Sequence, residues 1–97
     1  MLIGVLEAHL NLSGVTSLKA KRSIIKSLMG RLKSRFNLSI AEVDHQDSKA
    51  AAVIGVAIVS NNTRFLDQQL DTILDFMRND GRFYLGRVER ETFSSAF

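Results

Sequence analysis

The hydrophobic residues of this chain switch between the spacing of a β-strand and that of an α-helix, and the order of the switches leaves few folds open. Residues 2–12 place apolar side chains at every second position, as a strand with one buried face does. Residues 18–36 repeat them with helical period along one broad stripe. Two strand patterns follow at 38–45 and 50–60, around the turn HQDSK. A second helical pattern and a last strand at 82–91 complete a β-α-β-β-α-β order.

Capping residues mark where the two predicted helices begin and end. Thr16 or Ser17 precedes the first helical pattern, and Asn61 or Asn62 precedes the second. Their side-chain oxygens accept hydrogen bonds from free backbone N–H groups at a helix N-terminus. We expect the second helix to run to about Asn79, where an Asp-Gly pair ends it.

This order of elements favours one arrangement in space. Two helices pack most economically on one face of a four-stranded antiparallel sheet, in the ferredoxin-like arrangement of the α+β class. We therefore predict a single ferredoxin-like domain over residues 1–97. Hydrophobic residues make up 45% of the chain and charged residues 24%, which is typical of a folded domain and argues against disorder.

Composition also bounds the compartment and the class of partner. The chain has no cysteine, which excludes disulfides and thiolate metal sites and favours a reducing, cytoplasmic setting. The opening MLIGVLEAHL lacks the basic region and cleavage signature of a signal peptide. The longest apolar run, residues 50–59, is too short to cross a bilayer, so no membrane partner is expected.

Positive charge is concentrated in the first predicted helix. Residues 17–36, SLKAKRSIIKSLMGRLKSRF, carry a charge of +7 and no acid, while the rest of the chain carries −4. On a helical wheel a strip of small residues (Ala20, Ser23, Ser27, Gly30 and Ser34) separates two basic margins. One margin holds Lys19, Arg22, Lys26 and Lys33, and the other holds Arg31 and Arg35.

A helix built only for solubility usually alternates Glu with Lys at i,i+4, and this one has no such pairs. We therefore predict that the cations of both margins contact the phosphates of an RNA backbone. The alternative is a solvated helix face whose long side chains cover the edge of the core.

The predicted third strand is apolar on both faces, although helices can cover only one of them. This predicts self-association through an aliphatic sheet face formed by Ile3, Val5, Val53, Ala57 and Val59, or through an edge strand. The alternative is a plain apolar central strand, with Tyr84 and the tail TFSSAF folding over it. The two central strands hold no aromatic residue, which argues against RNA binding by base stacking on the sheet.

Three stretches, SLKAKR, RFNLSIAEVDHQD and GVAIVSN, occur in this order and resemble the YlxP-like family, a bacterial domain of unknown function. The resemblance covers essentially the whole chain and implies the same ferredoxin-like fold. Genes of the family commonly lie near those of translation and ribosome-maturation factors, including ribosome-binding factor A. The resemblance thus implies RNA or the ribosome as the partner. Members often carry a Trp and an Arg just after HQD, where this chain has Lys49 and Ala51.

The loop before the first helix is a second candidate for binding a phosphate-sized anion. Helix N-termini present free N–H groups to anions, and the candidate residues are Gly14, Thr16, Ser17 and Lys21. The alternative is an ordinary capped helix start. The fold also hosts acylphosphatases, which use this loop, but their chemistry needs an Arg within it, and none precedes Arg22.

Acidic and imidazole side chains gather at the second hairpin, at Glu42, Asp44, His45 and Asp47, with His9 as a further neighbour. They could bind a divalent metal, but their spacing matches no strong motif. We predict no cofactor and no catalytic residue. The leading hypothesis is a non-enzymatic RNA- or ribosome-associated module. The rival is a homo-oligomeric protein-interaction domain that acts through the aliphatic sheet face.

Overall fold

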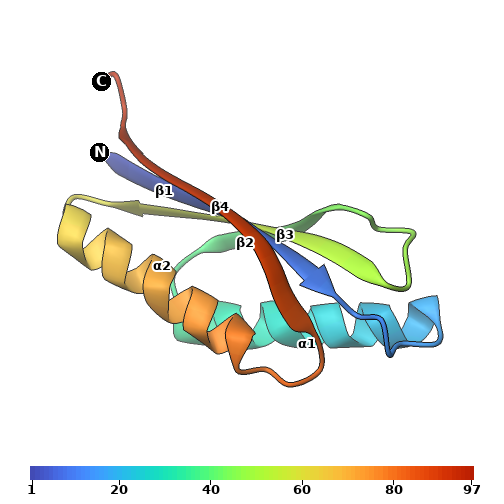
Figure 1. The fold of residues 1–97 in the computed structure, drawn as a ribbon. Helices are drawn as coiled ribbons and strands as arrows, with labels where there is room; N and C mark the ends of the chain where they lie inside the picture. Colours follow the sequence, from blue (N-terminus) through green and yellow to red (C-terminus); the bar gives the residue numbers. More distant parts are fainter.

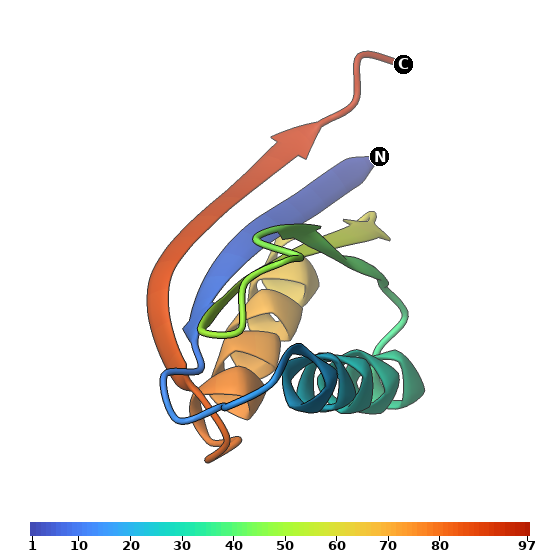
Figure 2. The same cartoon turned by 90° about the vertical axis from the view of Figure 1, so that its right-hand side faces the viewer.

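The computed structural model describes residues 1–97 as two helices against a sheet (Figure 1). The elements follow the predicted order: β1 (Leu2–Asn11), α1 (Leu18–Arg35), β2 (Ser39–Asp44), β3 (Ala51–Ser60), α2 (Thr63–Arg78) and β4 (Tyr84–Ser94). The sheet is antiparallel throughout, with strand order β2-β3-β1-β4. Both helices lie on the same side of it (Figure 2). The prediction of a ferredoxin-like α+β fold is confirmed.

The core lies between the sheet and the two helices. Alternate residues of β1 and β3 point into it, among them Leu6 and Ile54, and they meet Leu28 of α1 and Leu70 of α2. The intervening residues of these strands lie on the side away from the helices, called the open face below. Gly4 sets the distance of α2 from the sheet, since a Cβ there would stand 2.9 Å from a Leu66 methyl carbon.

Both helix starts are capped as predicted. Ser17 Oγ accepts a hydrogen bond from Ala20 N at 3.0 Å, and Asn62 Oδ1 accepts one from Phe65 N at 2.9 Å. At each helix start, one free N–H group therefore has a partner supplied by a neighbouring residue in the chain.

The last strand is longer than predicted. It runs to Ser94 instead of ending at residue 91, because its second half finds backbone partners along the first half of β1. Phe93 lies directly opposite Ile3 in this register. The tail residues 92–94 thus extend the sheet instead of folding over its open face, and Tyr84 stays largely exposed at the other end of the strand.

Candidate nucleic-acid interface

Four of the six predicted phosphate-contacting cations form one continuous exposed margin of α1. We call Lys19, Arg22, Lys26 and Lys33 the basic flank. All four are exposed, and no carboxylate of the chain lies within 4.0 Å of their charged atoms. With a rise of 1.5 Å per residue, the flank extends about 21 Å along the helix. It is a row of charges without internal partners.

The other two predicted cations are bound within the molecule. The guanidinium carbons of Arg31 and Arg35 lie 4.9 and 4.8 Å from the centre of the Phe76 ring on α2. Arg31 also reaches Asp80, at 3.9 Å. Cation–π contacts of this kind hold the two helices together. Both side chains nevertheless remain exposed, so the prediction that they also contact phosphate stays a prediction.

A polar junction joins the loop after α2 to the middle of α1. Arg82 donates to both carboxylate oxygens of Asp80 at 2.7 Å and to Ser27 Oγ at 3.1 Å. The Asp80 side chain has no exposed surface. The hydrogen bond from Arg82 lowers the pKa of Asp80 despite burial, and the charges of Arg82 and Arg31 add to this. The junction keeps the Arg31 margin against α2.

The small-residue strip between the margins faces solvent. Ala20, Ser23, Gly30 and Ser34 are exposed, and only Ser27 is partly covered. A Cβ added at Gly30 would meet no atom within 4 Å, so packing inside the chain does not require glycine there. The strip leaves room for another backbone to approach α1 beside the basic flank.

Lys21 does not serve the predicted anion site. Its side chain has no exposed surface, and its Nζ lies 2.7 Å from Glu42 Oε2 and donates to the His45 carbonyl at 2.6 Å. The ammonium is thus paired at the end of β2, and the prediction that places it on an anion is wrong. Gly14 and Thr16 are exposed, and Ser17 acts as the N-cap. The geometry favours the capped helix start.

The acidic hairpin does not form a metal centre. Glu42 pairs with Lys21, and Asp44 Oδ1 accepts a hydrogen bond from the backbone N–H of His45 at 2.7 Å. No three His, Asp or Glu side chains of the chain come together in an arrangement that could hold a metal ion.

The predicted interface residues do share the open face. Val59 lies opposite Ile3, which lies opposite Phe93, and Ala57 lies opposite Val5 in the next row. Val59 is 61% exposed and Phe93 41%. Sequence reasoning missed Phe93 because it ended the strand too early. The alternation of Thr92, Phe93 and Ser94 was the available signal.

Val53 must be removed from that set. It lies on the open face opposite His9, but its side chain is only 3% exposed. A partner could gain almost no contact area from it.

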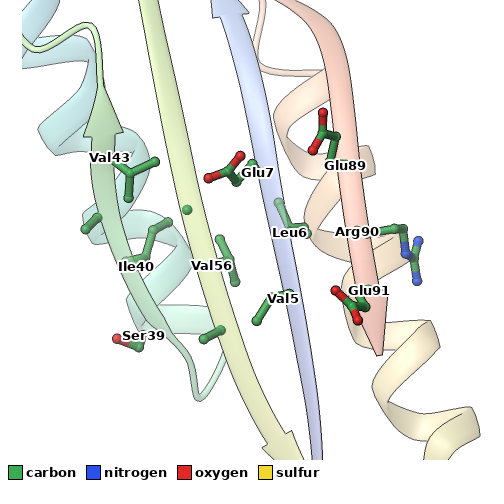
Figure 3. A pocket seen from close by; sticks show the side chains of 13 residues that line it. Val5, Leu6, Glu7, Ser39, Ile40, Val43, Val56, Glu89, Arg90 and Glu91 are labelled. Atoms are coloured by element: carbon green, nitrogen blue, oxygen red, sulfur yellow. The ribbon is translucent and has the colours of Figure 1, made fainter. Parts of the chain in front are cut away.

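The middle of the open face is an acidic groove of about 510 Å³ (Figure 3). Its floor includes Val5 and Ala57, and Val43 packs over Gly55 beside it. Its carboxylates are Glu7, Glu89 and Glu91, with Glu7 directly opposite Glu89 in the strand register.

Little positive charge offsets these carboxylates. Arg87 contacts Glu89, whereas Arg90 points away from the groove (Figure 3) and binds Asp71 of α2 at 2.6 Å. Like charges directly opposite one another repel. The open face therefore has the wrong sign for a phosphate backbone.

The chain matches the family described as "Protein of unknown function (DUF503)" over residues 3–90. It belongs to this family. It is also 32% identical over 76 residues to "Uncharacterized protein YlxP" of Bacillus subtilis (strain 168), a match that covers 78% of this chain and 83% of that protein. The resemblance to YlxP-like proteins is confirmed.

Solved structures show a similar fold at low sequence identity. The de novo designed protein Foldit4 matches with a TM-score of 0.56 at 13% identity, covering 98% of this chain and 99% of that one. SnoaB, a cofactor-independent oxygenase from Streptomyces nogalater, matches with a TM-score of 0.50 at 8% identity, covering 99% and 94%. These likenesses concern the fold alone. Neither helix of the structure is both long and apolar enough to cross a membrane.

Proposed function

We propose that this protein is a non-enzymatic RNA- or ribosome-associated module that binds the phosphate backbone through the basic flank of α1. The observation that supports this is the flank itself: Lys19, Arg22, Lys26 and Lys33 are exposed and have no carboxylate within 4.0 Å. Each phosphate that a cation neutralises releases counterions, which drives association. The exposed strip beside the flank lets a nucleic-acid backbone come close to the helix.

The opposite side of the molecule is poorly suited to the same task. The central strands β1 and β3 hold no aromatic residue on which bases could stack, and the groove on the open face carries Glu7, Glu89 and Glu91. RNA is therefore expected on the helix side.

The test is fluorescence anisotropy with structured ribosomal RNA fragments across a salt series. Four phosphate contacts predict a slope of about −3 to −4 in log affinity against log salt. A variant with Lys19, Arg22, Lys26 and Lys33 changed to Gln should lose most of that slope.

A matched control removes four exposed cations elsewhere, by changing Lys49, Arg64, Arg78 and Arg87 to Gln. It should keep most of the slope, because only the flank is expected to meet phosphate. Equal weakening by both variants would mean that net charge alone binds RNA. No binding at low salt would reject the function.

Self-association through the open face is the second candidate, favoured by the exposed row of Val59, Ile3 and Phe93. Strands lie about 4.8 Å apart and rise about 3.3 Å per residue, so this face offers roughly 600 Å² per copy. That is near the lower limit of about 600 Å² per partner for specific interfaces. Light scattering with size-exclusion chromatography tests it, and a monomer at high micromolar concentration would reject it. The two candidates use opposite sides of the molecule.

A further inference from the structure

Two stretches that lie far apart in the sequence meet at one end of the molecule. The start of α1 and the turn between β2 and β3 lie side by side in both views (Figures 1 and 2). Lys21 of α1 joins them, with Nζ at 2.7 Å from Glu42 Oε2 and at 2.6 Å from the His45 carbonyl oxygen. Lys21 is the one charged residue that is buried as a whole, while Asp80 has a buried side chain elsewhere.

Stability alone does not explain this arrangement. Removing a lysine and a glutamate from water is costly, and an apolar pair of similar volume commonly stabilises a core at least as well. The Lys21 side chain has no exposed surface, so an unbranched apolar residue of similar length could take its place. What the ammonium adds is a bond to the carbonyl of an exposed turn residue. We interpret the ion pair of Lys21 and Glu42 as a contact that fixes the backbone of the turn.

Hydrogen bonds hold the backbone of that turn at both of its ends. His45 has φ of +59°, in the left-handed region that few residues other than glycine adopt. Its N–H donates to Asp44 Oδ1 at 2.7 Å, and its carbonyl also accepts from Ser48 N at 3.0 Å. Ser48 Oγ accepts from the backbone N–H groups of Ala50 and Ala51, each at 3.2 Å.

The side chains at the end of this fixed turn remain free. His45, Gln46 and Asp47 are exposed and carry an imidazole, a carboxamide and a carboxylate. Gln46 makes only a long contact, 3.4 Å, to the Glu42 carbonyl. A rigid backbone that presents polar side chains is the usual construction of a recognition loop.

We propose that residues 45–47 contact an unpaired nucleotide of the RNA whose phosphates lie on the basic flank, and that Lys21 is the positioning residue for this contact. The inference rests on the proposed RNA-binding function. Arg22 of the flank follows Lys21 directly, so the first residues of the flank lie near the turn. Asp47 repels phosphate but accepts hydrogen bonds from base amino groups, which places a base and not the backbone at the turn. The imidazole of His45 can stack on an unpaired base, and the carboxamide of Gln46 can form hydrogen bonds with the edge of a base.

The experiment compares two RNAs with equal numbers of phosphates, a hairpin with an unpaired loop and a fully paired duplex. The wild type should bind the looped RNA about tenfold more tightly, the ratio expected from one or two base contacts. The variant His45→Gly, Gln46→Ala, Asp47→Ala should lose this preference and keep the duplex affinity and salt slope. Glu91→Ala, with the same charge change on the open face, should keep the preference.

A second variant tests whether Lys21 positions the turn for RNA or only stabilises the fold. Lys21→Met with Glu42→Leu removes both charges of the pair together, so no unpaired charge is left behind. We expect an unchanged Tm, faster hydrogen exchange at the Ser48 amide, and loss of the preference for looped RNA. A merely structural role would change Tm and leave the preference intact.

The outcomes distinguish the inference from the function on which it rests. Equal binding of both RNAs by the wild type, or an unchanged preference in the turn variant, overturns the inference and leaves the flank as the RNA-binding surface. Failure to bind either RNA at low salt overturns both.

Discussion

The basic flank of α1 and the open face of the sheet are two surfaces of one small chain with opposite chemistry. The flank presents Lys19, Arg22, Lys26 and Lys33 without an internal partner. The open face combines a row of exposed apolar side chains with the carboxylates of the groove. The net charge of +3 conceals this division. The two surfaces therefore differ in the sign of their charge and in their polarity.

The difference follows from where each surface lies in the fold. The flank belongs to a helix whose core stripe already packs on the sheet, so its outer residues can all be charged. The open face includes β3, which is apolar on both sides, and no helix covers its second side. Its groove nevertheless holds three glutamates, which exclude phosphate.

The largest expected effect comes from removing the charges of the two surfaces separately. Changing Lys19, Arg22, Lys26 and Lys33 to Gln should weaken RNA binding about 100-fold at low salt, because the counterion-release term is lost. Changing Glu7 and Glu89 to Gln should alter RNA affinity by less than about threefold, since those carboxylates lie on the far side. Anisotropy titrations measure both. Equal effects would show that the two surfaces do not act separately.

A charge placed in the row of Ile3, Val59 and Phe93 tests self-association through the open face without changing the basic flank. Val59→Asp places a carboxylate where a partner copy would exclude water, so the dissociation constant of self-association should rise at least about tenfold. Analytical ultracentrifugation over a concentration series measures it, with Phe65→Asp on α2, on the helix side of the sheet, as a matched control. RNA affinity per monomer should stay constant. If RNA binding falls with self-association, the two surfaces are coupled.

The junction of Asp80 with Arg82 should make the free energy of unfolding depend on pH. The pKa of Asp80 is lowered in the folded chain, chiefly by the hydrogen bond from Arg82, so its contribution to stability is present above the ordinary value of 3.8. That contribution is lost as the pH falls from 3.8 through the lowered pKa of Asp80. Asp80→Asn should cost about 1–3 kcal/mol at neutral pH and nearly nothing at the acid end. Urea unfolding at several pH values measures this, and a constant difference would contradict it.

The smallest effect concerns the strip beside the flank. Gly30→Ala should raise the free energy of unfolding by about 0.5–1 kcal/mol, because alanine favours a helix and its Cβ meets no neighbour. RNA affinity should fall by about two- to threefold, since the added methyl keeps a backbone from the helix. Ser23→Ala, which changes little in volume, is the control. Stabilisation without any change in affinity would show that RNA does not approach the strip.

Several features of the protein could be predicted from its sequence because they depend on nearby residues. The periodicities of 18–36 and of the strands gave the element order, and Ser17 and Asn62 marked the helix starts. The basic margins followed from helical geometry alone. The aliphatic open face followed from a strand that is apolar on both sides.

Other features depended on contacts between residues far apart in the chain. Lys21 looked like an anion ligand, and only the meeting of α1 with β2 showed that Glu42 and His45 pair with it. Phe76 and Asp80 likewise bind Arg31 from another element.

Local patterns thus determined the elements of this protein, their order and the residues available on each face. The tertiary structure decided which charges are free, because pairing depends on which side chains meet across elements. It also decided that β4 reaches Ser94 and brings Phe93 beside Ile3, since a strand ends where its partner's backbone groups do. Charge and periodicity can be read from the sequence, whereas the pairing of charges and the length of an edge strand depend on how the sheet and the helices pack.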